Sequence, residues 1–131
     1  MKKTILMLIL AAMSTGAMAE WVRSHEFVFA DVYVDPSAIQ KNGNMTKMWS
    51  LSDYRVQQVE SFGTFRSSKA LHEYDCKFGR VRFLATTHYS EQMGAGKVVG
   101  SIELLGDWSH VARGTVGETD WEIACGKIKL K

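Results

Sequence analysis

Histidine and cysteine are the side chains of this chain that most often serve metal binding or redox catalysis. The histidines are His25, His72, His88 and His110. None stands in a His-x-His, His-Glu-x-x-His or mixed Cys/His pattern, the spacings that bring several ligands onto one zinc ion. The two cysteines form no Cys-x-x-Cys redox motif. The spacing therefore predicts no metal site and no cofactor.

The serine nucleophiles of hydrolases stand in recognisable local patterns, and this sequence carries none of them. Gly-x-Ser-x-Gly does not occur, and Ser24-His25 and Ser109-His110 are sequence neighbours, which does not create the geometry of a nucleophile and its base. Gly94-Ala95-Gly96 lacks the Gly-Lys-Ser/Thr run of a phosphate-binding loop and is interpreted as a turn. We therefore predict that the protein has no catalytic residues and is not an enzyme.

The N-terminal residues 1–19 predict export. Two lysines precede an apolar run from Ile5 to Met13, and Ala17-Met18-Ala19 follows, which is the pattern of a secretory signal peptide cleaved after Ala19. The run is too short to cross a hydrocarbon core of ~30 Å as a helix. Residues 20–131 are then one exported domain with no transmembrane segment, because a chain of this length forms a single core.

Charge and cysteine content narrow the class of the mature protein. Two of the 16 basic residues, Lys2 and Lys3, lie in the signal peptide, so the remaining basic residues equal the 14 acidic ones. Nucleic-acid binding normally requires a basic excess, so we expect no nucleic-acid partner. In an exported chain Cys76 and Cys125 predict a disulfide, which in the chain-entropy model constrains the unfolded state by roughly 4 kcal/mol.

Alternating apolar and polar residues from Trp21 to Ile102 predict antiparallel strands. Met45, Lys47, Trp49 and Leu51 should share one face, and 55–63 should form a loop. Segments 65–76 and 80–90 should pair across a Phe78-Gly79 turn. That register sets Asp75 opposite Arg82, Tyr74 opposite Phe83 and Lys69 opposite His88, with His72 and His88 on opposite faces.

A helix is predicted near the C-terminus. Thr115 and Glu118 fit a capping box that opens it, and Gly126 stands where it should stop. Trp121, Ala124 and Cys125 would share one helical face. The fold class is therefore α+β: a mostly antiparallel β-sheet with a short C-terminal helix packed on it and tied by one disulfide.

Tryptophans and bases are the candidates for a contact surface. We expect Trp49 and Trp121 in the core, whereas Trp21 and Trp108 are either core or exposed contacts. Arg66, Lys69 and Arg82 are taken as a hypothetical macromolecule-binding surface. The alternative is a solvated strand face interleaved with Glu73 and Asp75.

Ordered segments over nearly the whole mature chain resemble one known family. They are Val34-Asp35-Pro36-Ser37-Ala38-Ile39, an Asn-Gly turn, Met48-Trp49-Ser50-Leu51-Ser52-Asp53-Tyr54, Ser67-Ser68-Lys69, Glu73-Tyr74-Asp75-Cys76, Tyr89-Ser90, Met93-Gly94-Ala95-Gly96, Trp108 and Ala124-Cys125-Gly126. In this order they resemble the surface-adhesin protein E family of Gram-negative bacteria.

The resemblance implies a disulfide-bonded antiparallel sheet with a C-terminal helix and a non-enzymatic role. Its namesake is an outer-surface adhesin that binds host extracellular-matrix and plasma proteins and can dimerise. Two departures stand out: no cysteine for a lipid anchor follows the signal, where Glu20 stands, and Arg113-Gly114-Thr115 replaces the Pro-Gly-Ser of many relatives. The expected location is the periplasm or the outer surface of a Gram-negative bacterium.

Three hypotheses of function follow. The first is an exported, adhesin-like binding protein that contacts a host matrix or plasma protein. The second is a periplasmic accessory or inhibitor protein of the cell envelope, with an envelope protein as partner and no adhesive role. The third is a small-ligand carrier or hydrolase, which would require a deep pocket lined by polar groups.

Overall fold

The structure, a computed structural model, describes residues 19–130. The predicted signal peptide, apart from Ala19, lies outside the described residues. Strands make up most of the regular structure: β1 (Val22–Glu26), β2 (Ala30–Val34), β3 (Gln40–Asn42), β4 (Met45–Glu60), β5 (Gly63–Asp75), β6 (Arg80–Tyr89), β7 (Val98–Glu103) and β8 (Ser109–His110). Two 3-10 turns, η1 (Pro36–Ala38) and η2 (Gln92–Gly94), and one helix, α1 (Val116–Ala124), complete the elements.

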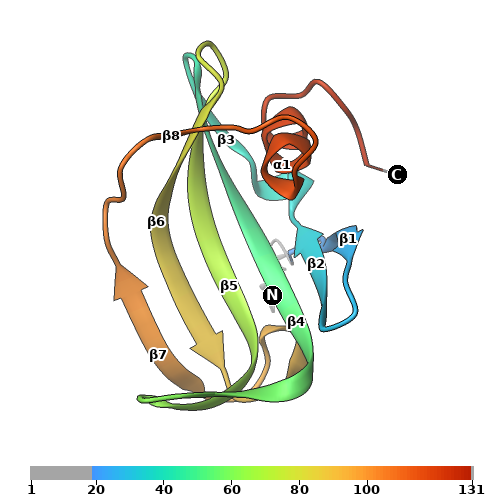
Figure 1. The fold of residues 1–131 in the computed structure, drawn as a ribbon, viewed down its shortest axis with the longest axis vertical. Helices are drawn as coiled ribbons and strands as arrows, with labels where there is room; N and C mark the ends of the chain where they lie inside the picture. The colour runs from blue at the N-terminus through green and yellow to red at the C-terminus, as the bar shows by residue number, and fades with distance from the viewer. Residues whose placement is uncertain (1–18, 131) are drawn as a thin grey trace, which may run out of the picture.

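All the strand pairings are antiparallel and follow the order β1-β2-β4-β5-β6-β7, with β3 beside β4 and β8 beside β6. Figure 1 shows β4, β5 and β6 as the long central strands, with β7 at one edge, β1 and β2 at the other, and α1 beside the upper part of β4. The predicted fold class is therefore confirmed.

The two faces of the sheet are covered by different segments. On the helix face, Ile123 and Ala124 of α1 pack against Val34, Met48 and Tyr74 to form the main core cluster. These side chains are at most 4% exposed, so the core is small but closed.

The opposite face, which we call the loop face, carries Leu51 opposite Lys69 and Asp53 opposite Ser67. Residues 90–96, which contain η2, fold over it. The Ser67 hydroxyl donates to the carbonyl of Glu91 at 2.5 Å and accepts from the backbone N–H of Gly94 at 2.8 Å. Leu51 is completely buried beneath this segment.

The C-terminal helix forms as predicted. The Thr115 hydroxyl accepts from the backbone N–H of Glu118 at 3.3 Å, and Gly126 follows the helix with a φ of 73°. Cys76 and Cys125 form the predicted disulfide, with their Cα atoms 5.6 Å apart. The helix is thereby fixed to the end of β5.

The predicted register of the β5–β6 hairpin is wrong by two residues at its turn. Asp75 lies opposite Arg80, and Glu73 lies opposite Arg82. The cause is the Asp75 carboxylate, whose Oδ1 accepts from the backbone N–H groups of Lys77 and Phe78 and closes a four-residue turn. A shift by two residues keeps each side chain on its face, so Tyr74 still faces the core.

Two irregularities in the sheet overturn further predictions. The loop expected at 55–63 is instead a continuation of β4 to Glu60, which pairs with Gly63 beyond a register shift between Asp53 and Gln58. In β6 a second shift, beside Leu84, sets Ser68 rather than Lys69 opposite His88. His88 therefore shares the helix face with His72, contrary to the prediction.

Candidate functional site: an aromatic pocket with a lysine

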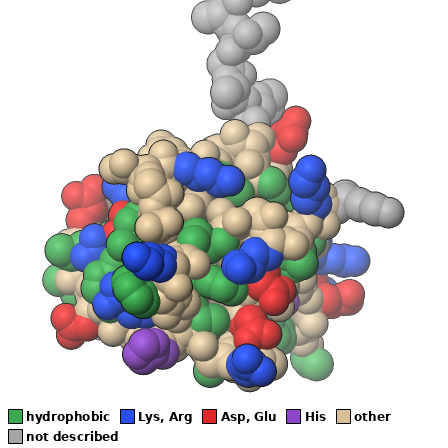
Figure 2. Space-filling model, turned by 90° about the horizontal axis from the view of Figure 1, so that it is seen from above, with side chains coloured by type: hydrophobic (Ala, Val, Ile, Leu, Met, Phe, Trp, Pro, Cys, Tyr) green, Lys and Arg blue, Asp and Glu red, His purple; other side chains and the backbone are tan. Residues whose placement is uncertain are grey.

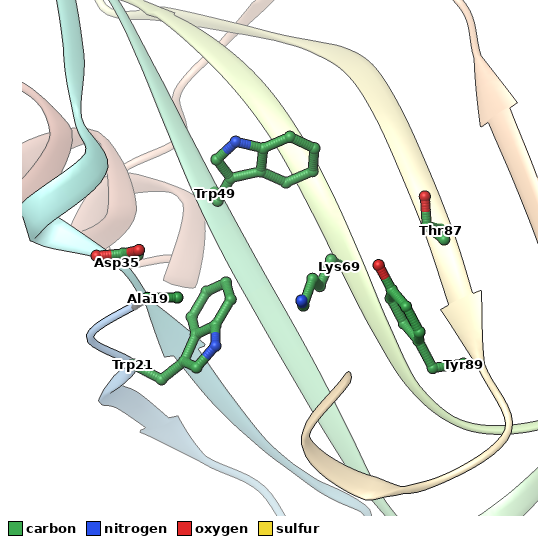
Figure 3. Close-up of a pocket in the computed structure, with 7 residues that line it drawn as sticks. All are labelled: Ala19, Trp21, Asp35, Trp49, Lys69, Thr87 and Tyr89. Atoms are coloured by element: carbon green, nitrogen blue, oxygen red, sulfur yellow. The ribbon is translucent and has the colours of Figure 1, made fainter. Parts of the chain in front are cut away.

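A pocket of about 300 Å³ opens on the loop face, a volume at the lower end of those that bind small ligands. Three of its seven lining residues are aromatic, and three others carry polar or charged side chains. The lining residues are Ala19, Trp21, Asp35, Trp49, Lys69, Thr87 and Tyr89, which Figure 3 shows arranged around a common space.

Strand alternation places the central residues of the pocket. Trp49 on β4 alternates with buried Met48 and so shares the loop face with Leu51, as predicted. Lys69 on β5 lies opposite Thr87 on β6, and Tyr89 follows two positions later on the same face. Three neighbouring strands therefore present four side chains to one surface.

Trp21 reaches the pocket from the edge of the sheet. It precedes β1, whose first residue, Val22, pairs with Val34 at the end of β2. This pairing brings Trp21 beside Asp35, the next residue after β2. The N-terminal segment thus forms one wall, and β4, β5 and β6 form the floor.

The ammonium of Lys69 is the free cation of this pocket. Its Nζ lies 5.0 Å from the ring centre of Tyr89 and 5.7 Å from that of Trp21, so two aromatic faces stabilise the charge. Within the described residues, no carboxylate oxygen lies within 4.0 Å of this nitrogen. A ligand with a negative group would therefore find an unpaired partner here.

Gly94 packs closely against the stem of Lys69. Its φ is +72°, and a Cβ at this position would lie 2.6 Å from Cε of Lys69. A larger residue here would strain the backbone and force the end of the lysine side chain to move. The backbone N–H of Met93 also donates to Oδ1 of Asp53 at 2.9 Å, so the segment is bound to β4 as well as β5. The glycine-rich turn, predicted from the sequence, supports the pocket.

Asp35 lies at the other end of the pocket and is 3% exposed. Its Oδ1 accepts hydrogen bonds from the backbone N–H of Ser37 at 3.1 Å and from the Ser37 hydroxyl. Asp35 thereby caps the N-terminus of η1. In Figure 3, Trp21 lies between Asp35 and Lys69. The pocket therefore has an acidic end and a basic end, separated by an indole ring.

The structure does not bring the three predicted surface bases together. Arg82 donates to Glu73 at 2.7 Å and lies 4.4 Å from the ring centre of Trp108, so its charge is compensated. Arg66 donates to the carbonyl of Arg55 at 3.3 Å and is not among the residues that line the pocket. Lys69 alone lies in the pocket.

The tryptophan predictions have mixed outcomes. Trp121 packs against the core cluster as expected, and its Nε1–H donates to the carbonyl of Asp75 at 2.9 Å. The prediction for Trp49 is wrong, because this ring lines the pocket on the face opposite the core. Of the two left open, Trp21 lines the pocket and Trp108 covers Arg80 and Arg82.

A serine and a histidine that are distant in sequence do meet, on the helix face. The Ser68 hydroxyl lies 2.6 Å from Nδ1 of His88, and burial lowers the pKa of this histidine. The imidazole ring is stacked near Phe62 and Phe65, and Ser68 is only 8% exposed. The hydroxyl therefore orients a half-buried ring. No local sequence motif marks this pair, because the two residues are 20 positions apart.

Side-chain clusters that could hold a metal ion and helices that could span a bilayer are two kinds of feature that would bear on function within residues 19–130. In this part of the chain, no cluster of three or more His, Cys, Asp or Glu side chains could hold a metal ion. No helix between these bounds is both long and apolar enough to cross a bilayer. Figure 2 shows acidic and basic side chains interspersed over the face in view, with apolar side chains between them.

Comparison with known proteins places the chain clearly. A family model described as surface-adhesin protein E matches residues 21–126. The structure of Haemophilus influenzae protein E superposes with a TM-score of 0.67 at 15% identity, covering 86% of this chain and 89% of that one. Its crystal form II superposes with a TM-score of 0.67 at 15% identity, covering 86% of this chain and 92% of that one. Protein E of non-typeable Haemophilus influenzae superposes with a TM-score of 0.61 at 13% identity, covering 83% of this chain and 86% of that one. No curated protein matches the sequence.

Proposed function

The chain belongs to the surface-adhesin protein E family, and we propose on that premise that it is an exported protein that binds a host extracellular-matrix or plasma protein and catalyses no reaction. Family membership supports an adhesin-like surface role. The place of contact is inferred from one observation, the unpaired ammonium of Lys69 between two aromatic rings. We assign the binding surface to this pocket rather than to Arg66 or Arg82.

Export is part of the proposal. The signal-peptide pattern leads us to infer cleavage after Ala19, which leaves residues 20–131 as a single domain in the periplasm or on the outer surface. Because Ala19 lines the pocket, this cleavage would widen it beside Trp21.

A binding role accounts for the polar groups better than catalysis does. In the pocket, the Asp35 carboxylate is held by Ser37, and the Lys69 ammonium contacts aromatic faces. The Ser68–His88 pair lies on the other face of the sheet, packed among phenylalanine rings. Aromatic rings beside one free charge are typical of recognition surfaces.

Binding of the exported protein to immobilised matrix and plasma proteins tests this function. We expect saturable binding that weakens in Lys69→Met and persists in Lys77→Met. Lys77 is the matched control, because its Nζ also lies over an aromatic ring, at 5.3 Å from Phe78, but in the exposed β5–β6 turn. Labelling of intact native cells should find the protein on the surface.

Two results would contradict the proposal. The protein would be protected from protease and labels on intact cells, or it would bind no matrix or plasma protein at any concentration. Both results would favour the periplasmic accessory or inhibitor function.

A further inference from the structure

The pocket combines three kinds of group that can recognise a ligand. It offers one unpaired ammonium, from Lys69, and the ring faces of Trp21, Trp49 and Tyr89. It also offers hydroxyl groups, from Thr87 and Tyr89, that both donate and accept hydrogen bonds. A complementary ligand carries one negative charge, a flat apolar face and several hydroxyls.

The position of the pocket on the sheet restricts the ligand further. Its floor is formed by β4, β5 and β6, which are interior strands whose backbone groups bond to neighbouring strands. A peptide recognised as an added strand needs free backbone groups, and this floor provides none. The ligand must therefore be recognised by side chains, which suits a sugar ring better than an extended peptide.

Charge and size exclude a long polyanion as the occupant. Beyond the predicted signal peptide, basic residues only equal the acidic ones, so the domain has no excess of positive charge to hold a long polyanion. A volume of about 300 Å³ accommodates one ring rather than a chain. Asp35 supplies the one carboxylate of the lining, and in the described residues no carboxylate oxygen lies within 4.0 Å of the Lys69 ammonium, so a single carboxylate of a ligand can pair with it at that end of the pocket.

We propose that this pocket binds a pyranose ring that bears a carboxylate, such as a uronic acid or sialic acid residue at a glycan terminus. The proposal rests on the proposed function and names the chemical group that the exported protein would recognise on its partner. The carboxylate pairs with Lys69, the ring stacks on Trp21 or Trp49, and the ring hydroxyls bond to Thr87, Tyr89 and Asp35.

Nuclear magnetic resonance of the exported protein, isotope-labelled and purified from expressing cells, provides the test. The four tryptophans give four indole N–H signals, of which those of Trp21 and Trp49 report on the pocket. Trp108 and Trp121 lie outside it and are internal controls. The probes are N-acetylneuraminic acid and glucuronic acid, the methyl ester of each, N-acetylglucosamine, and acetyl-glutamate amide.

We expect one or both sugar acids to shift the Trp21 and Trp49 signals saturably, with a dissociation constant on the order of 1 mM for so small a ligand. The sugar acid that binds more tightly identifies whether the recognised residue is a uronic acid or a sialic acid. Methyl esters and N-acetylglucosamine should bind at least about tenfold more weakly, because the charge-assisted bond to Lys69 is lost. Lys69→Met should weaken binding equally, and Lys77→Met should not.

The ester comparison uses the unmodified protein, so the test does not depend on how a variant folds. Four results would each overturn the proposal. The acid and its ester bind equally well, the shifts are confined to Trp108 and Trp121, neither acid causes a shift, or acetyl-glutamate amide binds more strongly than the sugar acids. Matrix binding without sugar-acid shifts would refute this inference and leave the proposed function standing. Sugar-acid shifts without matrix binding would support this inference and refute the proposed function.

Discussion

The indole nitrogen of Trp121 donates a hydrogen bond to the backbone carbonyl of Asp75 at 2.9 Å, one residue before the disulfide-bonded Cys76. Helix α1 is therefore attached to the end of β5 by two adjacent links, one covalent and one polar. Both leave from the β5–β6 turn, which Asp75 closes with its side chain. The end of the hairpin and the C-terminal helix behave as one structural unit.

Removal of the disulfide should destabilise the fold without changing its topology. We expect the double variant Cys76→Ala, Cys125→Ala to lose about 2–5 kcal/mol of unfolding free energy, because the 49-residue separation is no longer constrained in the unfolded chain. Urea denaturation of the variant measures the loss, and reduction of the wild-type protein should reproduce it. An unchanged midpoint in both experiments would contradict this view of the helix attachment.

Acid should weaken the fold through Asp75. Hydrogen bonds from Arg80, and then from the turn backbone, hold the pKa of this carboxyl below its usual value. The unfolded chain takes up the proton first, so the stabilisation is complete above about pH 4 and is lost as the pH falls through the lower, folded-state pKa. Asp75→Asn should remove this acid dependence, measured as the urea midpoint between about pH 5 and pH 2. The exposed Asp107→Asn should keep it, and an unchanged profile in Asp75→Asn would refute the assignment.

His72 should contribute a second pH dependence, in a higher range. Burial lowers its pKa, so between the folded-state value and about 6.5 the unfolded chain binds a proton that the folded chain does not. Stability is therefore retained above about pH 6.5 and decreases as the pH falls below it. His72→Gln should flatten this decrease, whereas the exposed His110→Gln should not. Identical slopes for both variants between about pH 7.5 and about pH 5.5 would count against a buried, neutral His72.

Gly94 should be sensitive to substitution because of Lys69. Gly94→Ala combines the strain of a positive φ with a Cβ that would lie 2.6 Å from Cε of the lysine. Gly43 is the matched control, because it has a φ of +61° and no atom within 4 Å of the position that a Cβ would take, so Gly43→Ala measures the strain alone. We expect both to lose about 1 kcal/mol from strain and Gly94→Ala to lose more. Equal losses would show that the lysine end moves aside at no measurable cost, and would contradict a tight contact between Gly94 and Lys69.

Some of the fold follows directly from the sequence, for reasons that particular residues make plain. The helix begins at Thr115 and ends before Gly126 because capping is a local property. The disulfide is predictable because an exported chain with two cysteines has one intramolecular pairing. Alternation through Trp49 and Leu51 likewise identifies one face of β4.

The pocket could not be predicted, because it depends on long-range register. Lys69 and Tyr89 meet only because a register shift beside Leu84 moves the lower half of β6 by one position. Trp21 joins them through the pairing of β1 with β2. The Asp75 side chain closes the β5–β6 turn, and β4 contains a bulge. Neither feature is marked by the alternation of apolar and polar residues, so neither can be read from the sequence. The sequence identifies Lys69 as a surface base but gives no sign of its aromatic surroundings.

Site-specific photo-crosslinking tests the central claim most directly, because it identifies the surface that contacts the partner. A benzophenone-bearing phenylalanine analogue is placed at Tyr89, which lines the pocket, and in a second protein at Phe78, which is 62% exposed in the β5–β6 turn. Both proteins are irradiated on the matrix or plasma protein that they bind. A cross-link from position 89 and none from position 78 is the predicted result; a cross-link from position 78 alone, or from neither while binding persists, would contradict it.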